Sequence, residues 1–560
     1  MDKNPEADRR LLIALVLTML VMYVWSTYIS PPPMPSSTTA AESATADPAQ
    51  PGATTAASAS GSAGAPEGSA AAAVGDEEIP KATQALRGDG FEVTLDSKDG
   101  ALHSVTLQDY KTEATVTPIW QHLIDKVKGK AAESWVAYHG GGDAARVMTE
   151  DGALVIAGAG PVTGDVAFHV DPSAGGGATA SRKLPSGLTV NKTFRPGDKP
   201  HTIAVTVEFR NDGTSAVSPL WVGVADKAHK LEGRFDNVML PVGLTDGSIQ
   251  HLEDPAKVEG TSSVTEDGPV QWLGFSNRYF LAALLPADPT PFKLVFDELP
   301  DGRAAVFASD EAPLAPGQSR TVQLTAYVGP KDLSLLERTG NDLDDAVEYG
   351  FFGFFSKILL FLLEVLHKGV NNWGVAIILL TLLVKLLFFP LTQKSYVSSK
   401  RMQQLQPAMN ELKERYKDDP AKQQQEMMKL FQDNNVNPLG GCLPTLVQLP
   451  VWFGLYSCLL YSVELYNSSF LYLRDLTAAD PFGVLPTAVA VLFYAQQLMT
   501  PTTGMDPAQQ KMMRIMPLIF SVFMYSLPSG LVLYISVNSI LSIAQMWVIN
   551  KTLPAPAPVK

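Results

Sequence analysis

A single charged side chain lies inside the five apolar runs that follow residue 372, and it is the first candidate for function. Lys385 stands within the run 373–389, four residues after Thr381. Charges inside membrane segments usually mark functional sites, and this one could attract an anionic group electrostatically. Alternatively, Lys385 snorkels to the headgroups, because it lies five residues, roughly 7.5 Å, before Pro390. Helical side chains tilt toward the start of their helix, which opposes snorkelling in a segment that runs inward.

Few other residues have the type or spacing that catalysis, metal binding or a disulfide would need. Cys442 and Cys458 are the only cysteines, and on one helix they would lie roughly 24 Å apart, too far for a disulfide. Two cysteines cannot form a cysteine-rich zinc site or an iron–sulfur cluster. Most histidines lie within 80–330, without a G-x-S-x-G motif or metal-ligand spacing. The sequence therefore predicts no catalytic residue, no metal and no cofactor.

Net charge divides the chain into two parts. The 560 residues carry a net charge of −14, which argues against DNA as a partner. Residues 31–350 carry −19 and the remainder +5, and this basic remainder contains nearly all the long apolar runs. A purely soluble protein is therefore excluded.

Membrane helices must position Lys385. The uncharged run 11–28 follows two arginines and is predicted to be an uncleaved anchor, with a cleaved signal peptide as the alternative. A helix at 351–370 mixes charges with Phe and Leu, which is typical of the membrane interface. The other predicted spans are 373–389 (ending at Pro390), 439–463, 482–499, 515–527 and 531–549. Six crossings put both termini and the basic loop 391–438 in the cytoplasm.

Between the anchor and the later spans the pattern changes twice. Residues 31–79 are rich in Ala, Ser, Thr, Pro and Gly, and are predicted to form a disordered linker outside the cytoplasm. From 80 to 330 apolar and polar residues alternate, as they do from Ile203 to Phe209, and turn residues separate the segments. Many short alternating strands predict a large β-sandwich.

The loop 391–438 has an amphipathic pattern of its own. Its apolar residues recur at spacings of three and four, as in a coiled-coil seam. Asp419 is placed to cap a second helix that Pro420 begins. The seam is too short for a free coiled coil, so an antiparallel helical hairpin is predicted. Its apolar residues are Met402, Leu405, Met409, Leu412, Met427 and Leu430.

Motifs between 345 and 550 resemble those of the YidC/Oxa/Alb membrane-protein insertases. They are NWG at 372–374, T-x-x-x-K at 381–385, PLT at 390–392, NPLGGCLP at 437–444, QLP at 448–450, PTT at 501–503, DP at 506–507 and PSGLVLY at 528–534. The anchor, linker and β-domain are similar to the Gram-negative branch of the family, whose periplasmic domain resembles a sugar-mutarotase-like sandwich.

The resemblance implies a fold class. It is a polytopic α-helical membrane protein with six transmembrane helices and a five-helix insertase core, together with a large periplasmic all-β super-sandwich domain. The implied divisions are the anchor 1–30, the linker 31–79, the β-domain 80–330, a linker with the interfacial helix at 331–372, the core 373–550 with its cytoplasmic hairpin 391–438, and the cytoplasmic tail 551–560.

The resemblance also implies a function that is not enzymatic. Such a protein inserts and folds nascent inner-membrane proteins in the bacterial inner membrane, alone or with the Sec translocon, and hydrolyses no nucleotide. A basic residue in a hydrophilic groove receives the polar tail of the substrate. Here it is Lys385 where the family usually has Arg, and lysine keeps the charge without the planar bidentate fork. The expected groove residues are Lys385, Thr381, Gln448, Leu449, Pro450, Gln496, Ser521, Tyr534 and Asn538.

Alternatives remain for several of these features. Each embedded polar residue, including Gln497, Ser536, Ser539, Ser542 and Gln545, could instead form an interhelical hydrogen bond worth about 1 kcal/mol. The short tail has only Lys551 and Lys560 to neutralise phosphates, so a weak ribosome contact is expected through the cytoplasmic loops. The phospholipid bilayer is the remaining expected partner.

Two other functions are alternatives to insertion. A secondary transporter would need intramembrane Asp or Glu and repeated halves, and the sequence shows neither. A membrane-anchored periplasmic protein that binds or isomerises sugars would use the cleft of a mutarotase-like domain. A fold alone does not carry an activity, however.

Overall fold

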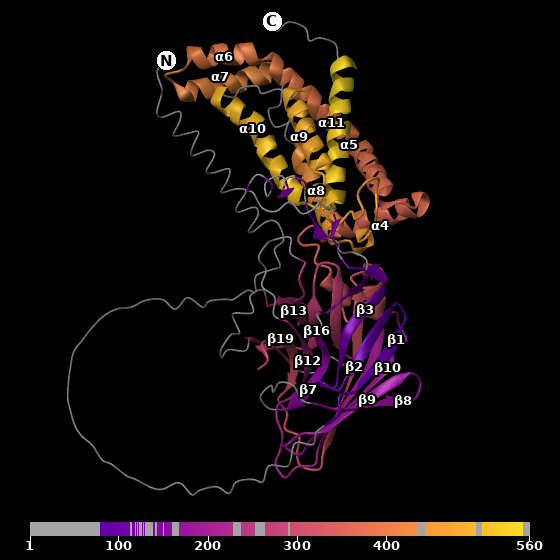
Figure 1. Cartoon of the computed structure of the whole chain (residues 1–560). Helices are drawn as coiled ribbons and strands as arrows, with labels where there is room; N and C mark the ends of the chain where they lie inside the picture. Colours follow the sequence, from indigo (N-terminus) through magenta and orange to yellow (C-terminus); the bar gives the residue numbers. More distant parts are fainter. Residues whose placement is uncertain are drawn as a thin grey trace, which may run out of the picture.

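The computed structural model describes residues 79–112, 143–148, 151–159, 167–227, 237–252, 264–288, 292–434, 443–499 and 507–552, with a few residues between 115 and 139. The predicted anchor at 11–28, nearly all of the linker 31–79, Cys442 and most of the motif 437–444 lie outside the described residues. In Figure 1 a β-domain lies at one end of a group of helices, and the helices α6 and α7 lie at the other end.

The β-domain contains two large antiparallel sheets. One has the strand order β1-β2-β3-β7-β12-β19-β18-β15, with β6 paired to β3, and the other has the order β14-β13-β16-β17-β20-β11-β10-β9-β8. The strands of the first sheet are β1 (Thr83–Gly88), β2 (Phe91–Asp96), β3 (Ala101–Lys111), β6 (Ala144–Arg146), β7 (Ala153–Ala159), β12 (Leu220–Lys227), β15 (Val264–Glu266), β18 (Lys293–Glu298) and β19 (Arg303–Asp310). Those of the second are β8 (His169–Ser173), β9 (Gly177–Lys183), β10 (Leu188–Pro196), β11 (Thr202–Asn211), β13 (Leu240–Thr245), β14 (Ser248–His251), β16 (Val270–Ser276), β17 (Phe280–Pro286) and β20 (Ser319–Pro330). The strands β4 (Thr115–Val116) and β5 (Tyr138–His139) form a separate pair.

The core of the β-domain is formed by residues that alternate along its strands. In β11, Ile203, Val205, Val207 and Phe209 are buried, whereas Ala204 between them is exposed. The predicted alternation is therefore confirmed. Successive side chains of a strand point to opposite faces, so one face of β11 contributes to the core.

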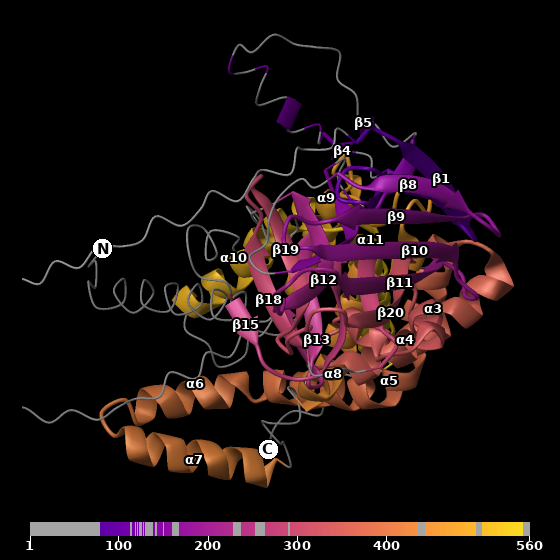
Figure 2. The ribbon, with the colours of Figure 1, turned by 90° about the horizontal axis from the view of Figure 1, so that it is seen from below.

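The helical part begins after the last strand. Its elements are α3 (Leu333–Thr339), η3 (Leu343–Ala346), α4 (Gly353–Val370), α5 (Trp373–Gln404), α6 (Gln406–Arg415), α7 (Pro420–Asp433), α8 (Leu443–Tyr461), η5 (Val463–Leu465), α9 (Val484–Met499), α10 (Pro507–Phe523), η6 (Met524–Ser526) and α11 (Ser529–Thr552). The helix α11 packs against α9, α5 and α8, and α10 packs against α9. Figure 2, seen from below, shows α6 and α7 extending to one side of the bundle.

The predicted end of the helix at Pro390 is wrong. Pro390 does not end the helix, which continues through it to Gln404. A proline inside a helix removes one backbone hydrogen bond, and the surrounding turns can still propagate the helix. Similarly, α10 begins at Pro507, eight residues before the predicted span at 515–527.

Two described helices are long and apolar enough to cross a membrane, Trp373–Met402 and Ser529–Ile549. The helix Val484–Met499 and the segment Ile515–Ser526 are apolar but shorter. The number of six crossings remains a prediction, because the first predicted span lies outside the described residues.

The helix α4 lies across the base of the bundle, where it meets α8 and α5 (Figure 1). Ser356 donates a hydrogen bond of 2.9 Å to the backbone oxygen of Gly454 in α8. A Cβ at Gly454 would lie 2.7 Å from that of Phe355, so this crossing requires glycine. At the other end of α4, the His367 ring stacks on Trp373, with centroids 3.8 Å apart. These contacts fix the start of α5 relative to α4.

The loop between α8 and α9 joins the helices to the β-domain. Tyr466 packs its ring edge-on against Phe280 with centroids 5.2 Å apart, and it lies 6.2 Å from the ring of Tyr110. The backbone N–H of Lys111 donates a hydrogen bond of 2.9 Å to Asn467 Oδ1. Val463 and Tyr466 belong to the same hydrophobic cluster as the β-sandwich core. The two parts of the molecule therefore share a packed interface.

The helices α6 and α7 form a hairpin. Asp419 caps α7 by accepting a hydrogen bond of 3.1 Å from the backbone N–H of Lys422, and Pro420 is the first helical residue, which confirms the predicted cap. Between the helices, Leu405, Met409 and Phe431 are buried. Met402, Met427 and Leu430 pack around them. Most of the predicted apolar face is therefore used to hold the two helices together.

Candidate functional site: a polar seam between α5 and α11

Lys385 lies where α5 and α11 pack against each other. Its Nζ donates a hydrogen bond of 2.7 Å to Ser542 Oγ. The Ser542 hydroxyl donates in turn to the backbone oxygen of Asn538, one turn earlier in α11, at 2.8 Å. Lys385 is half-buried, and no carboxylate among the described residues pairs with it. The positive charge therefore contacts a neutral acceptor.

A second polar contact joins the same two helices. Gln545 Nε2 donates a hydrogen bond of 2.7 Å to Thr392 Oγ1. The Thr392 hydroxyl itself donates to the backbone oxygens of Phe388 and Phe389, both at 3.0 Å. Residues three apart on a helix are neighbours, so Ser542 and Gln545 present one polar face to α5. We call Lys385, Thr392, Ser542 and Gln545 the α5–α11 seam.

The other expected groove residues of α5 and α11 lie near this seam. Thr381 is buried one turn before Lys385, and its hydroxyl donates to the backbone oxygen of Ile377 at 2.7 Å. Asn538 is half-buried and lies one turn before Ser542, and Tyr534 is buried one turn before Asn538. Thr381 and Asn538 therefore flank the Lys385–Ser542 contact without forming it through their side chains.

The remaining expected residues lie on α8, α9 and α10. Gln448, Leu449 and Pro450 are half-buried in α8, and Gln496 is half-buried in α9. Ser521 is buried, and its hydroxyl donates at 2.7 Å to the backbone oxygen of Leu518 in its own helix. The described hydrogen bond of Lys385 reaches α11 only, so these residues are not joined to it directly.

Three residues of the seam lie outside the expected groove set. Ser542 and Gln545 belong to the embedded polar residues, and Thr392 belongs to the PLT motif. The spacing of these residues along the chain nevertheless carries a signal. Ser542 and Gln545 are three residues apart, and Lys385 and Thr392 are seven apart, so each pair lies on one helical face. Which faces meet still depends on how the helices pack.

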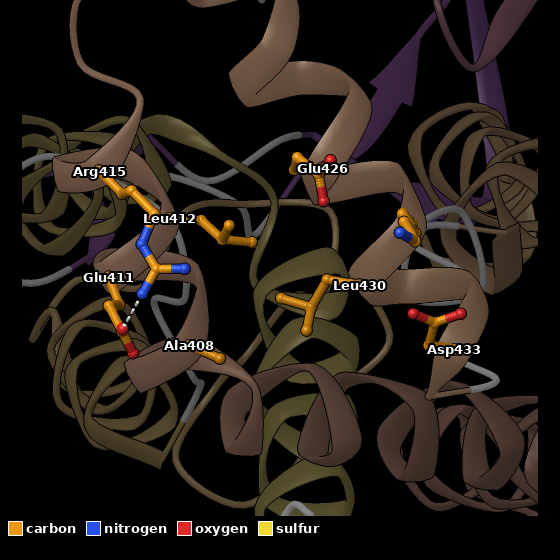
Figure 3. Close-up of a pocket in the computed structure, with 8 residues that line it drawn as sticks. Ala408, Glu411, Leu412, Arg415, Glu426, Leu430 and Asp433 are labelled. Carbon is orange, nitrogen blue, oxygen red and sulfur yellow. Dashed lines mark hydrogen bonds and ion pairs between the residues drawn. The ribbon is translucent and has the colours of Figure 1, made fainter.

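A second candidate surface lies on the hairpin. A cavity of about 260 Å³ opens between α6 and α7. In Figure 3, Leu412 and Leu430 lie near its middle, with Glu426 and Asp433 on the α7 side. On the α6 side Arg415 pairs with Glu411 at 2.7 Å, and both side chains are exposed, so the pair adds little stability. The lining mixes both signs of charge around a small apolar floor.

Metal binding has no support in the described part of the chain. No group of three or more His, Cys, Asp or Glu side chains there is arranged to hold a metal ion. The α5–α11 seam itself offers hydrogen bonds and one ammonium group.

Two family models match the chain. The model described as "60Kd inner membrane protein" matches residues 365–556, which include the α5–α11 seam. The model described as "YidC periplasmic domain" matches residues 158–362, which include most of the β-sandwich. The two matches together span both parts of the described fold.

Two relatives match the chain over nearly its full length. The chain is 37% identical over 566 residues to the membrane protein insertase YidC of Citrifermentans bemidjiense, covering 98% of this chain and 99% of that protein. It is 38% identical over 568 residues to the protein of the same name from Anaeromyxobacter dehalogenans strain 2CP-C, with the same coverage of 98% and 99%. A solved structure of an active YidC insertase is 19% identical, covers 83% of this chain and 94% of that chain, and has a TM-score of 0.34.

Proposed function

This chain belongs to the YidC family of membrane protein insertases, and on that premise we propose that the α5–α11 seam receives the polar end of a nascent inner-membrane protein. The chain is an inner-membrane protein with a periplasmic domain, and it inserts membrane proteins into the bilayer. Lys385 is the receiving charge, and insertion needs no catalysed step by the insertase itself.

The observation that carries this proposal is the uncompensated charge of Lys385. A buried ion is normally paired, because leaving it unpaired within a membrane is costly. Here the described partner of the ammonium is the neutral hydroxyl of Ser542. An acidic group that enters beside α5 would therefore find a cation whose charge no described carboxylate has neutralised.

The size of the attraction suits transient binding. Two opposite charges 4 Å apart attract by roughly 4 kcal/mol at an effective dielectric near 20, before the cost of desolvation is subtracted. That energy can hold an acidic tail briefly. It is too small to trap the tail once the membrane potential acts on the chain.

Exposed apolar side chains support an exit route for the substrate along two of the helices. We propose that the apolar segment of a substrate moves into lipid along α8 and α10, the third and fifth predicted spans. On α10, Ile519 and Val522 are exposed and face away from the bundle core. Such a surface is compatible with contact to an apolar helix or to lipid.

The orientation of the protein in the membrane limits which partners each side can contact. The β-domain matches a periplasmic family model and the hairpin lies at the opposite end of the bundle (Figure 1), which supports a cytoplasmic position for the hairpin. We propose that both termini are also cytoplasmic, that the protein acts alone or with the Sec translocon, and that any ribosome contact uses the cytoplasmic loops. The terminal lysines alone release few counterions from RNA.

The proposal is tested with two model substrates that differ only in the charge of the N-terminal tail. Insertion is measured by protease protection for Lys385→Arg, Lys385→Ala and Lys385→Glu. We expect Lys385→Arg to insert both substrates normally. Lys385→Ala should fail with the acidic tail, Lys385→Glu should be worst, and the uncharged tail should tolerate all three changes.

A matched control is available on the same helix. Lys394 is exposed nine residues further along α5, so Lys394→Ala removes a charge without touching the seam and should leave both substrates unaffected. Equal loss of both substrates in Lys385→Ala would show that the lysine supports packing or hydration of the site, and the electrostatic proposal would be wrong.

A further inference from the structure

The loop between α8 and α9 ends in a narrow tip. The backbone N–H of Phe470 donates to the oxygen of Leu473 at 3.0 Å, and the N–H of Leu473 donates back to the oxygen of Phe470 at 2.9 Å. These two bonds close a turn with Leu471 and Tyr472 at its end. Leu473 is buried in the hydrophobic cluster of the helical part, so the turn is anchored from behind.

Leu471 is unusual in two ways. It exposes 84% of its surface, and its backbone has a φ of +53°, in the left-handed region. A bulky side chain is disfavoured in that region, where Gly, Asn or Asp would fit at lower cost. A strained position that displays a large apolar side chain suggests a functional contact rather than a simple turn.

The position of the tip relative to α5 indicates what that contact is. A Cβ at Gly374 would overlap the ring of Phe470, so the loop lies directly against the first turn of α5. That turn begins the apolar helix Trp373–Met402, which is long enough to cross a membrane. Aromatic residues such as Trp373 favour the level of the lipid headgroups. Because a helix long enough to cross the membrane begins here, we expect Leu471, the residue after Phe470, to lie at the level of the lipid headgroups.

The helix α4, which meets the start of α5, also exposes apolar side chains. Phe351 exposes 94% of its surface, and Phe354 and Phe361 of α4 are largely exposed as well. The helix α4 reaches the start of α5 through the stacked pair His367–Trp373. The helix α4 therefore presents further apolar surface at the end of the bundle that faces the β-domain (Figure 1).

We propose that the tip formed by Leu471 and Tyr472 is a lipid anchor, in which Leu471 enters the periplasmic leaflet beside the first turn of α5. The partner is the hydrocarbon of the bilayer. The anchor fixes the α8–α9 loop, and through Tyr466 the β-domain, at a set height above the membrane. This inference is independent of the role proposed for Lys385.

The test uses a fluorophore that senses its surroundings. The full-length protein carrying Cys442→Ser and Cys458→Ser is given one new cysteine, Leu471→Cys, labelled with an NBD group and reconstituted into vesicles of phosphatidylethanolamine and phosphatidylglycerol. Spin-labelled lipids then quench at a shallow or a deep position. Ser186→Cys is the control, because Ser186 is exposed in the turn between β9 and β10 of the β-domain.

We expect the label at position 471 to emit at shorter wavelength than the label at 186, and to lose emission mainly to the shallow spin label. The label at 186 should respond to neither. Water-like emission at 471 would overturn the anchor. Short-wavelength emission without quenching would also overturn it, because the tip would then be covered by protein. If Leu471→Cys lowers the melting temperature, the same measurement is made with Ser469→Cys, because Ser469 is exposed two residues before Leu471.

Discussion

The ammonium group of Lys385 and the hydroxyl of Ser542 lie 2.7 Å apart, although 157 positions separate them in the chain. The contact joins α5 to α11 and gives the lysine a neutral partner. Hydrogen bonds to charged groups contribute about 1.5–3 kcal/mol, so this one can orient the ammonium group without cancelling its charge. A carboxylate from a substrate would have to displace only a hydroxyl.

Ser542 therefore acts as a positioning residue. Ser542→Ala should reduce insertion of a substrate with an acidic tail by up to about tenfold, because losing about 1.4 kcal/mol corresponds to a factor of ten. Ser542→Thr keeps the hydroxyl and should restore insertion. The measurement is protease protection of the inserted substrate. Unchanged or increased insertion in Ser542→Ala would show that the hydroxyl does not orient the lysine.

Gly374 is predicted to be essential for the fit of the α8–α9 loop. Any Cβ at this position overlaps the Phe470 ring, so Gly374→Ala must displace the loop and should lower stability by about 1–3 kcal/mol. Gly369→Ala is the matched control, since a Cβ there meets nothing within 4 Å. Thermal unfolding in detergent compares the two variants. Equal melting temperatures would contradict the proposed packing.

Glu464 should make the junction between the helices and the β-domain sensitive to pH. Its Oε2 is shielded from solvent and has no hydrogen-bond partner among the described residues. Burial, together with the nearby carboxylates of Asp332 and Glu364, raises the pKa of Glu464 to about 8. The protonated form is therefore the one that fits the folded state.

The direction of the pH effect follows from that shift. A folded-state pKa above the unfolded value of about 4.3 gives stability that is complete below about pH 4 and is lost as pH rises through about 8. The melting temperature should therefore fall as the pH rises through this range, by roughly 2–4 °C for each kcal/mol of stability lost. Glu464→Gln mimics the protonated carboxyl and should flatten this part of the curve. Parallel curves for both proteins would rule out Glu464 as the titrating group.

The hairpin is expected to be required for insertion and to receive substrate before the seam does. Deleting 400–430 should abolish growth of a strain depleted of its own insertase. Met409→Asp should weaken function by placing a charge between the packed helices, whereas Met428→Ser, at an exposed position of α7, should not. Full complementation by the deletion would refute the requirement.

Local sequence patterns predicted much of this fold correctly. The alternation from Ile203 to Phe209 predicted a strand with one buried face, and Asp419 with Pro420 predicted where α7 begins. Both signals act within a few residues, through side-chain period and through capping of free backbone N–H groups. Pro390 misled the same reasoning, because a helix held by neighbouring helices can absorb the loss of one hydrogen bond.

By itself, the sequence determined that one lysine lies within an apolar helix and that polar residues are embedded in the helices around it. The tertiary structure decided which of them meet it. Ser542 faces Lys385 and Gln545 faces Thr392 only because α11 packs along α5 in one orientation. Likewise, Gly374 is required because Phe470, nearly a hundred residues later, lies on it. Contacts between distant segments depend on packing geometry, which residue spacing along one helix does not contain.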